Sequence, residues 1–452
     1  MSIQHGAITV DQLTPESGSM VGYDAVIVAT PDLAGRLVGK RLTTHHFVNT
    51  HTSGVRTCDV VFGWGLGHEL LDGFQSVGWE QGYGDFISRP DLNTLRPLAW
   101  WPRTALVLGD AFHPDGSTVS VSPRAILRQQ IEHAQSVGFH PWVVSELEFT
   151  LFNETSTTLQ EKGYTNLRLL QTELHPELVE TIHQSEHVLT AICTYMEGTG
   201  IPIESIKAEY SPGQVEINLS PAAPLEMADR HVIYKMGVRE ICRQHGHAAT
   251  FMAKWHQNFG GSSCHMHISL QDNDRRNLFA EGNDRHLSTF IGGLQRYARD
   301  VFLLWALYPN SYKRFRPGSF APASLNWGVD NRTATFRVVN EGASRHVENR
   351  IPGGDVNPYL GYAALLAAGL AGIEEHIEPY ANVGHTNAYA QSELPALPQS
   401  LDEAIQAFAT SDFAKRAFGT EVVSHLANFA AKELEASRLT VTDWDRLRLF
   451  DV

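Results

Sequence analysis

The chain has 452 residues, 42% of them hydrophobic, and is long enough to form two or three domains with sizeable cores. Lys and Arg together number 35 and Asp and Glu number 50, which leaves a formal net charge of −15 at pH 7. A surface with this charge repels a phosphate backbone, so the composition argues against a general nucleic-acid-binding protein.

The sequence shows no sign of export or of insertion into a membrane. The N-terminal segment MSIQHGAITVDQL has neither the basic nor the apolar stretch of a signal peptide. No later run approaches the roughly 18 uninterrupted apolar residues that a membrane helix needs. Cys58, Cys193, Cys242 and Cys264 form no CxxC pair and are expected to be reduced thiols. We therefore expect a cytoplasmic protein with no membrane and no nucleic-acid partner.

Short β-like runs separated by turns fill the N-terminal quarter of the chain. Residues 24–29 (DAVIVA) are apolar, and glycine-rich turn segments follow at 63–73 and 78–86. Prolines bracket a change of pattern at residues 97–102 (PLAWWP), after which the predicted elements are longer. We expect a β-rich N-terminal domain over residues 1–112 and a second domain over residues 113–452.

Helices and strands alternate in the second region. Ser122 as N-cap, Pro123 at the first helical position and Gly138 as C-cap predict a helix over residues 124–137. A strand over residues 142–152 follows it. Further helical patterns occupy residues 176–198, 224–245, 284–308 and 357–375, and β-like stretches lie near 203–219, 263–270 and 333–351. The predicted fold class is therefore α+β.

Acids and histidines recur at i, i+2 spacing on these strands. Glu146 and Glu148 share one face of the first strand, because side chains alternate between the two faces. The other such residues are Glu209 and Glu216 on either side of a Pro212-Gly213 turn, His265, His267 and Ser269, and Glu348 with Arg350. Each pair alone is more typical of a solvated strand face. If the faces line one cavity, five glutamates and a histidine converge there, which requires cations. Mainly oxygen ligands favour Mg²⁺ or Mn²⁺ over zinc.

Arginines follow within about 40 residues, in a stretch too rich in Gly, Pro and Asn for an amphipathic helix. They are Arg314, Arg316, Arg332, Arg337 and Arg350. Metals held by acids beside forked guanidinium donors suit a polyphosphate, because both neutralise the oxygens of a transferring phosphoryl group. The chain has no GxxxxGK[ST] loop and no strand-anchored GxGxxG. We therefore expect ATP to be bound through metals and arginines.

Six motifs in a fixed order resemble the glutamine synthetase superfamily. They are ELE, EYSPGQVE, GGSSCHMHISL, NSYKRFRPGSFAP, DNRTATFRV and ENRIPGGDVNPYLGYAALLAAGL. The N-terminal DAVIVATPDLAGRLVGKRL looks like the β-grasp domain of that family. The resemblance implies a β-grasp domain followed by a catalytic domain with a curved antiparallel sheet flanked by helices. It also implies a dodecamer of two stacked hexameric rings, with active sites between neighbouring subunits.

The resemblance also implies roles for individual residues. One metal is assigned to Glu148, Glu209 and Glu216, and a second to Glu146, His265 and Glu348. ATP is assigned to Glu204, His267, Ser269, Arg332 and Arg337, and glutamate and the transferring phosphoryl group to Gly261, Arg314 and Arg350. The implied catalytic residues are Arg314, Arg332, Arg337 and Arg350. With two or three Mg²⁺ or Mn²⁺ ions, these groups would favour phosphoryl transfer from ATP to the γ-carboxylate of L-glutamate and attack of a nitrogen nucleophile on the acyl phosphate.

Two departures from the ammonia-using members point to another nucleophile. The flap motif reads Gly318 to Pro322 (GSFAP), with Phe320 where those members carry a glutamate before AP. Residues 75–84 (QSVGWEQGYG) contain Glu80 as their only acid, where those members have an aspartate in a DGSS-like loop. SVGWEQGYGDF and PGSFAP look instead like the γ-glutamylamide synthetase branch, which joins glutamate to organic amines. Apolar surface at Phe320 and Trp79, with Glu80 to attract the ammonium, favours a small monoamine such as ethanolamine or an alkylamine over polyamines.

Two alternatives stay open from the sequence. The chain could be a true glutamine synthetase that uses ammonia, or a catalytically dead, ring-forming structural relative. The intact set of acids argues against the dead relative, because a scaffold has no need to keep buried carboxylates together. Tyr389 lies near the place where some relatives carry a modifiable tyrosine, but an exposed loop tyrosine without a role is the favoured interpretation.

Overall fold

The computed structural model describes Met20 and residues 22–173, 178–282, 284–339, 342–380, 382–391 and 393–452. Two sheets and eleven α-helices make up these residues, which confirms the predicted α+β class. The N-terminal segment examined for a signal peptide lies outside the described residues. Among the described residues, no helix is both long and apolar enough to cross a membrane.

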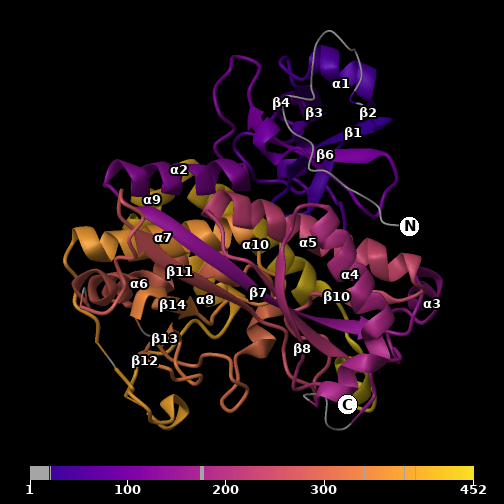
Figure 1. Ribbon diagram of the computed structural model, residues 1–452. Helices are drawn as coiled ribbons and strands as arrows, with labels where there is room; N and C mark the ends of the chain where they lie inside the picture. The colour runs from indigo at the N-terminus through magenta and orange to yellow at the C-terminus, as the bar shows by residue number, and fades with distance from the viewer. Residues whose placement is uncertain are drawn as a thin grey trace.

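The first sheet lies within residues 25–112 and forms the upper part of the molecule in Figure 1. Its strands are β1 (Ala25–Pro31), β2 (Leu37–Thr43), β3 (Val55–Cys58), β4 (Asp85–Pro90), β5 (Arg96–Pro97) and β6 (Thr104–Phe112). The order is β2-β1-β6-β4-β3, with β5 beside β6. The β1–β2 hairpin leads into α1 (Thr44–Thr50), and β1 pairs with β6 in parallel. This arrangement agrees with the predicted β-grasp domain.

The second sheet holds the acids predicted as metal ligands. Its strands are β7 (His140–Phe152), β8 (Ile203–Ala208), β9 (Gln214–Leu219), β10 (Ala248–Thr250), β11 (Cys264–Gln271), β12 (Trp327–Val329), β13 (Phe336–Val339) and β14 (His346–Asn349). The order is β12-β13-β14-β11-β7-β9-β8, with β10 beside β7. All of these pairs are antiparallel except β12 with β13.

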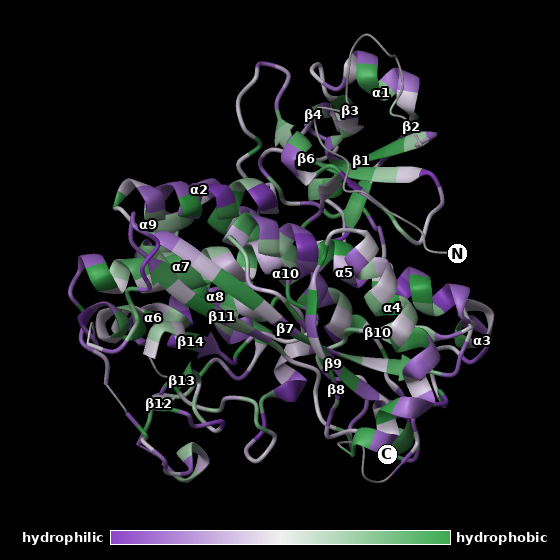
Figure 2. Ribbon diagram, viewed as in Figure 1, coloured by the Kyte–Doolittle hydropathy of each residue, from purple (hydrophilic) through white to green (hydrophobic). Residues whose placement is uncertain are grey.

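The described part of the second region also contains ten α-helices, most of which cover the apolar face of its sheet (Figure 1). They are α2 (Pro123–Ser136), α3 (Ser156–Glu161), α4 (Glu186–Gly198), α5 (Pro224–Gln244), α6 (Asp284–Trp305), α7 (Pro358–Glu374), α8 (Leu401–Thr410), α9 (Asp412–Phe418), α10 (Thr420–Leu439) and α11 (Asp443–Leu449). Short 3₁₀ helices lie at Asp59–Phe62, Leu92–Thr94, Val179–Ser185, Ser311–Arg314, Gly342–Ser344 and Ala388–Ala390. The central α7 is apolar along its whole length and buried (Figure 2).

Three local predictions need correction. The helix predicted over residues 176–198 starts as α4 only at Glu186, since the β-branched residues in Val179–Ser185 have lower helix propensity. Its first two predicted residues lie outside the described part. The strand predicted over 333–351 is two strands, because the chain turns at Gly342 with φ 63°. Ser122 occupies the N-cap of α2, but its hydroxyl makes no capping hydrogen bond.

Side chains alternate along β7, so one face of this strand packs in the core and the other carries the predicted metal ligands. Leu147, Phe149 and Leu151 are fully buried on the helix-covered face. On that same face, the Ser145 hydroxyl lies 2.7 Å from the Tyr362 hydroxyl of α7. Glu146 and Glu148 therefore project from the opposite face of the sheet.

Candidate active site

Strand register brings the predicted ligands together on one face of the second sheet. Glu146 on β7 is opposite His265 on β11, and Glu148 is opposite Glu216 on β9. On the other side, Glu348 on β14 is opposite both His267 on β11 and Arg337 on β13. Directly opposed side chains share a face at close range. Two clusters result, the Glu348 cluster (Glu146, His265 and Glu348) and the Glu148 cluster (Glu148, Glu209 and Glu216), each with ligand atoms within 4.8 Å of one another.

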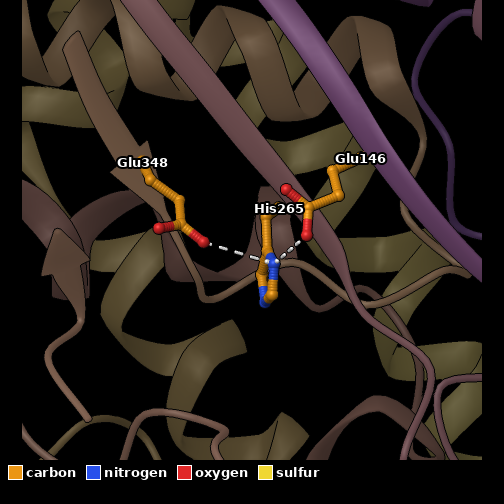
Figure 3. Close-up of side chains that lie close together, drawn as sticks. All are labelled: Glu146, His265 and Glu348. Carbon is orange, nitrogen blue, oxygen red and sulfur yellow. Dashed lines mark hydrogen bonds and ion pairs between the residues drawn. The ribbon is translucent and has the colours of Figure 1, made fainter. Parts of the chain in front are cut away.

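The Glu348 cluster converges on one imidazole nitrogen (Figure 3). His265 Nδ1 lies 3.2 Å from Glu146 Oε1 and 3.3 Å from Glu348 Oε1. Burial opposes ionisation of Glu348, but the charges of Arg350, His265 and His267 together outweigh it and lower the pKa of Glu348 to about 2. Burial likewise opposes ionisation of Glu146, and hydrogen bonds from His265 and His267 lower its pKa below the usual range. Both carboxylates are therefore ionised at neutral pH.

The Glu148 cluster is held in place by its surroundings. Glu148 accepts hydrogen bonds from the Ser263 backbone N–H at 2.8 Å, the Ser263 hydroxyl at 2.6 Å and Gln214 Nε2 at 2.7 Å. Glu209 follows β8, and a turn with Gly213 at φ 73° leads back into β9, which carries Glu216. Burial, followed by the charge of nearby Glu146, raises the pKa of Glu216 well above its usual range. Glu209 pairs with Lys207 at 2.5 Å, whereas Glu148 and Glu216 form no ion pair with a described residue.

The donor set fits divalent cations. Five carboxylates and one imidazole offer mainly oxygen ligands, and the raised pKa of Glu216 is what uncompensated carboxylates produce without a cation. Each cluster has three ligand groups within reach of one ion, as in the predicted assignment.

Two of the predicted catalytic arginines bind the same carboxylate. Arg337 donates to Glu348 Oε2 at 3.1 Å and also pairs with Asp330, while Arg350 donates to Glu348 Oε1. Both guanidinium groups are therefore positioned at the edge of the Glu348 cluster. Arg332 is exposed in the turn before β13 and makes no hydrogen bond or ion pair with either cluster among the described residues.

Arg314 and Gly261 fit together closely. Arg314 is buried and donates to the backbone carbonyls of residues 350–352, which include Pro352 O at 2.9 Å. A Cβ at Gly261 would lie 2.5 Å from Arg314 Cγ and 2.6 Å from the carbonyl oxygen of Ala253. Glycine is needed here because the Arg314 stem passes directly over the backbone.

A pocket of about 460 Å³ lies beside the Glu348 cluster, and three of the predicted ATP residues line it. These are Glu204, His267 and Ser269, with Glu146 at the cluster end. Trp142, Leu219 and Pro221 add apolar wall. A mostly apolar pocket with a few polar groups at one end is typical of a small-ligand site. The remaining two, Arg332 and Arg337, do not line it.

His346 is a site residue that the sequence interpretation missed. Its Nδ1 donates to Ser344 O at 2.8 Å, so its Nε2 is free to accept from His267 Nδ1 at 3.0 Å. His267 Nε2 in turn lies 3.0 Å from Glu146 Oε2. His346 is two positions before Glu348 on β14, so the i, i+2 rule could have placed it on this face. Gln214 and Ser263, which fix Glu148, lie two positions before Glu216 and His265, so the same rule could have placed them on this face.

The residues predicted to meet the amine are exposed. Phe320 has φ 58° and a side chain that is 58% exposed, and its carbonyl oxygen is 3.4 Å from Arg350. Trp79 is 75% exposed and packs edge-on against Tyr83, next to exposed Glu80. Within the described residues, no hydrogen bond, ion pair or ring contact joins Trp79 or Glu80 to the two clusters. Tyr389 donates its hydroxyl to Ala321 O at 2.9 Å, so it supports the flap backbone.

The fold and the two clusters define the class: the chain belongs to the glutamine synthetase family, whose catalytic domain matches residues 120–449. It is 41% identical over 432 residues to gamma-glutamylethanolamide synthetase GlnA4 of Streptomyces coelicolor, with 95% of this chain and 93% of the relative covered. It is 35% identical over 438 residues to a glutamate–isopropylamine ligase of a Pseudomonas species, with 95% of each chain covered. A solved GmaS/ADP complex matches with a TM-score of 0.84 and 25% identity, over 98% of this chain and all of that chain. The predicted family and its γ-glutamylamide branch are confirmed.

Proposed function

We propose that the protein is an ATP-dependent glutamate–amine ligase. It would phosphorylate the γ-carboxylate of L-glutamate and couple the acyl group to an organic primary amine, giving a γ-glutamylamide, ADP and phosphate. The observation that carries the proposal is the pair of three-ligand clusters beside Arg337 and Arg350, in a chain whose relatives are named for ligation of amines to glutamate.

The clusters would hold two or three Mg²⁺ or Mn²⁺ ions, with Glu148, Glu209 and Glu216 at one ion and Glu146, His265 and Glu348 at another. When bound, the ions would supply charge neutralisation for the phosphoryl group. His267, Ser269 and Glu204 would orient ATP in the adjoining pocket, and an ADP complex of a structural relative supports a nucleotide here. Arg332 and Arg337 would contact its phosphates, for which Arg332 would have to swing inward from its exposed turn.

Glutamate would bind on the Gly261 side of the clusters. Arg314 and Arg350 would grip its carboxylates and the transferring phosphoryl group, because a guanidinium fork matches planar oxygen pairs. The backbone at residues 350–352 fixes Arg314 before substrate arrives. Such fixed donors cost little reorganisation when charge develops on the oxygens.

The amine preference follows from the flap. Phe320 presents apolar surface to solvent at the position of the family's flap acid, and Trp79 offers more. Ethanolamine or a small alkylamine therefore suits the site better than ammonia, and better than a polyamine whose second charge would lack a partner. Glu80 would attract the ammonium group. Among the described residues, Trp79 and Glu80 contact neither cluster of their own subunit. This supports sites shared between subunits, as in the dodecamer of two hexameric rings that the resemblance implies. The cytoplasmic location stays a prediction from the sequence.

Phosphate release from ATP tests the proposal against its two alternatives. With Mg²⁺ and glutamate, a ligase for organic amines releases phosphate when ethanolamine or isopropylamine is added. A true glutamine synthetase responds to ammonium instead, and a dead structural relative responds to neither. Release that depends on ammonium alone, or no release at all, would contradict the proposed function.

A further inference from the structure

A second pocket lies at the C-terminal end of α5. It has a volume of about 350 Å³ and is bounded by α3, the last two turns of α5 and β10. Arg239 and Arg243 line it from α5, and Ser156, Gln160 and Tyr164 line it from α3 and the loop that follows. None of the described residues that line it is acidic.

Arg239 is the unusual group in this pocket. Its guanidinium makes no hydrogen bond and no ion pair with any described residue, although its side chain is only partly exposed. Arg243, one turn further along the same helix face, pairs with Glu240. Burial, followed by the like charge of Arg243, lowers the pKa of Arg239. The charge of Glu240 opposes this shift more weakly, and the Glu240 carboxylate itself pairs with Arg243, so Arg239 is a partly buried guanidinium without a direct ionic partner in the described part of the chain.

The remaining lining groups suit a ligand with several oxygens. The Ser156 and Tyr164 hydroxyls and the Gln160 amide can each donate a hydrogen bond. Ala248 and Ala249 on β10 leave the floor open because their side chains are small. The guanidinium fork of Arg239 offers paired N–H donors that match a carboxylate or a phosphate.

We propose that this pocket binds a small oxyanion bearing phosphate or carboxylate groups, held by the Arg239 fork with Arg243 beside it. The site is separate from the ATP pocket, since the two share no lining residue. An anion there would supply Arg239 with the direct ionic partner that it lacks among the described residues.

Calorimetric titration of the whole protein with inorganic phosphate, and separately with succinate, tests this site. Wild type should bind one more equivalent per subunit than Arg239→Gln, whatever the catalytic site itself takes up. Arg438→Gln is the matched control, because it removes an exposed arginine from α10 whose one ion pair with a described residue is to Asp402. A difference with phosphate alone assigns a phosphate-type ligand, and a difference with succinate alone assigns a carboxylate.

Equal stoichiometries in wild type and Arg239→Gln with both anions would overturn the proposal. The fold should survive the change, because Arg239 has no described partner to lose. In an anion-free buffer the Tm of Arg239→Gln should equal or exceed that of wild type. If that variant fails to fold, Arg239→Lys keeps the charge without the fork and should still lose the extra equivalent.

Discussion

At the scale of single residues, Glu348 links the predicted metal and phosphoryl functions. Its two carboxylate oxygens pair with His265, Arg337 and Arg350, and its side chain is 1% exposed. A buried carboxylate is tolerated only with such partners. Glu216 differs from Glu348. Burial raises its pKa most, and the next largest effect, the negative charge of Glu146, raises it further.

Glu216→Ala should abolish ligation while leaving the fold intact. Removal of a metal ligand is expected to lower turnover roughly 100-fold or more. Mutation of groups that only hydrogen-bond to a metal ligand already lowers metal affinity or activity by about 10–100-fold. Without metal, the Tm should not fall, because the change removes a carboxyl group whose ionisation burial and the neighbouring carboxylates oppose. Addition of Mg²⁺ should then raise the Tm less than in wild type. Glu186→Ala, at an exposed position of α4, serves as control, and near-normal turnover of Glu216→Ala at saturating Mg²⁺ would refute the metal assignment.

Phe320→Glu should shift preference toward ammonia and weaken the use of organic amines. A primary alkylamine has a pKa near 10.4, so only about one molecule in 10³ is neutral and nucleophilic at pH 7. A flap carboxylate attracts the ammonium ion and accepts its proton, whereas Phe320 offers contact to a carbon body. The ratio of kcat/KM for ammonium to that for ethanolamine reports the change. Phe320→Leu should leave the ratio near wild type, and an unchanged ratio in Phe320→Glu would count against the flap interpretation.

At the scale of elements, α10 contacts the N-terminal domain through several side chains, and one of them is a buried histidine. His425 Nε2 lies 2.7 Å from Phe62 O, and its ring stacks near Phe74. Its Nδ1 has no described hydrogen-bond partner. Burial lowers the pKa of His425 to about 4, so the folded protein keeps this ring neutral.

This histidine predicts a loss of stability in mild acid. Because the folded pKa is about 4 and the unfolded value 6.5, the unfolded chain takes up the proton first as the pH falls below 6.5. The stabilisation present above pH 6.5 should shrink by roughly 3 kcal/mol per subunit by pH 4. His425→Gln can keep the hydrogen bond to Phe62 without titrating. Its Tm should therefore fall less between pH 7.5 and pH 4.5 than that of wild type or of exposed His133→Gln, and identical pH profiles would contradict this account.

The sequence predicted strands and their polar faces better than element ends. On β7 the alternation of Glu146 and Glu148 with apolar neighbours is a local signal, and the structure follows it. Register between distant strands is not local. That His265 lies opposite Glu146 depends on pairing of β11 with β7, which the family resemblance supplied and the periodicity could not. The pocket at Arg239 has no sequence signal at all, because three separate elements build it.

At the scale of the whole molecule, the proposed function requires a second subunit to complete the site. Trp79 and Glu80 are exposed, and among the described residues they make no hydrogen bond, ion pair or ring contact with either cluster. The proposed rings would bring these residues from one subunit to the clusters of the next. Isolated subunits should therefore be inactive, and sedimentation of the active species should report a large oligomer.

Mixed rings test shared sites directly. Trp79→Ala and Glu216→Ala subunits should each form inactive rings. After co-expression in equal amounts, about one quarter of the sites in random closed rings would combine an intact loop with an intact cluster, and activity should recover accordingly. If both residues served the same subunit's site, every site would carry a defect and no activity would return.

The central claim is that an organic amine is the true nucleophile. The most direct test supplies ATP, Mg²⁺ and glutamate with equal concentrations of ammonium, ethanolamine and isopropylamine, and identifies the early products by mass spectrometry. The γ-glutamylamide of ethanolamine or isopropylamine should form well ahead of glutamine, because the flap offers Phe320 in place of a carboxylate. Glutamine formed as fast as either organic amide would contradict the claim.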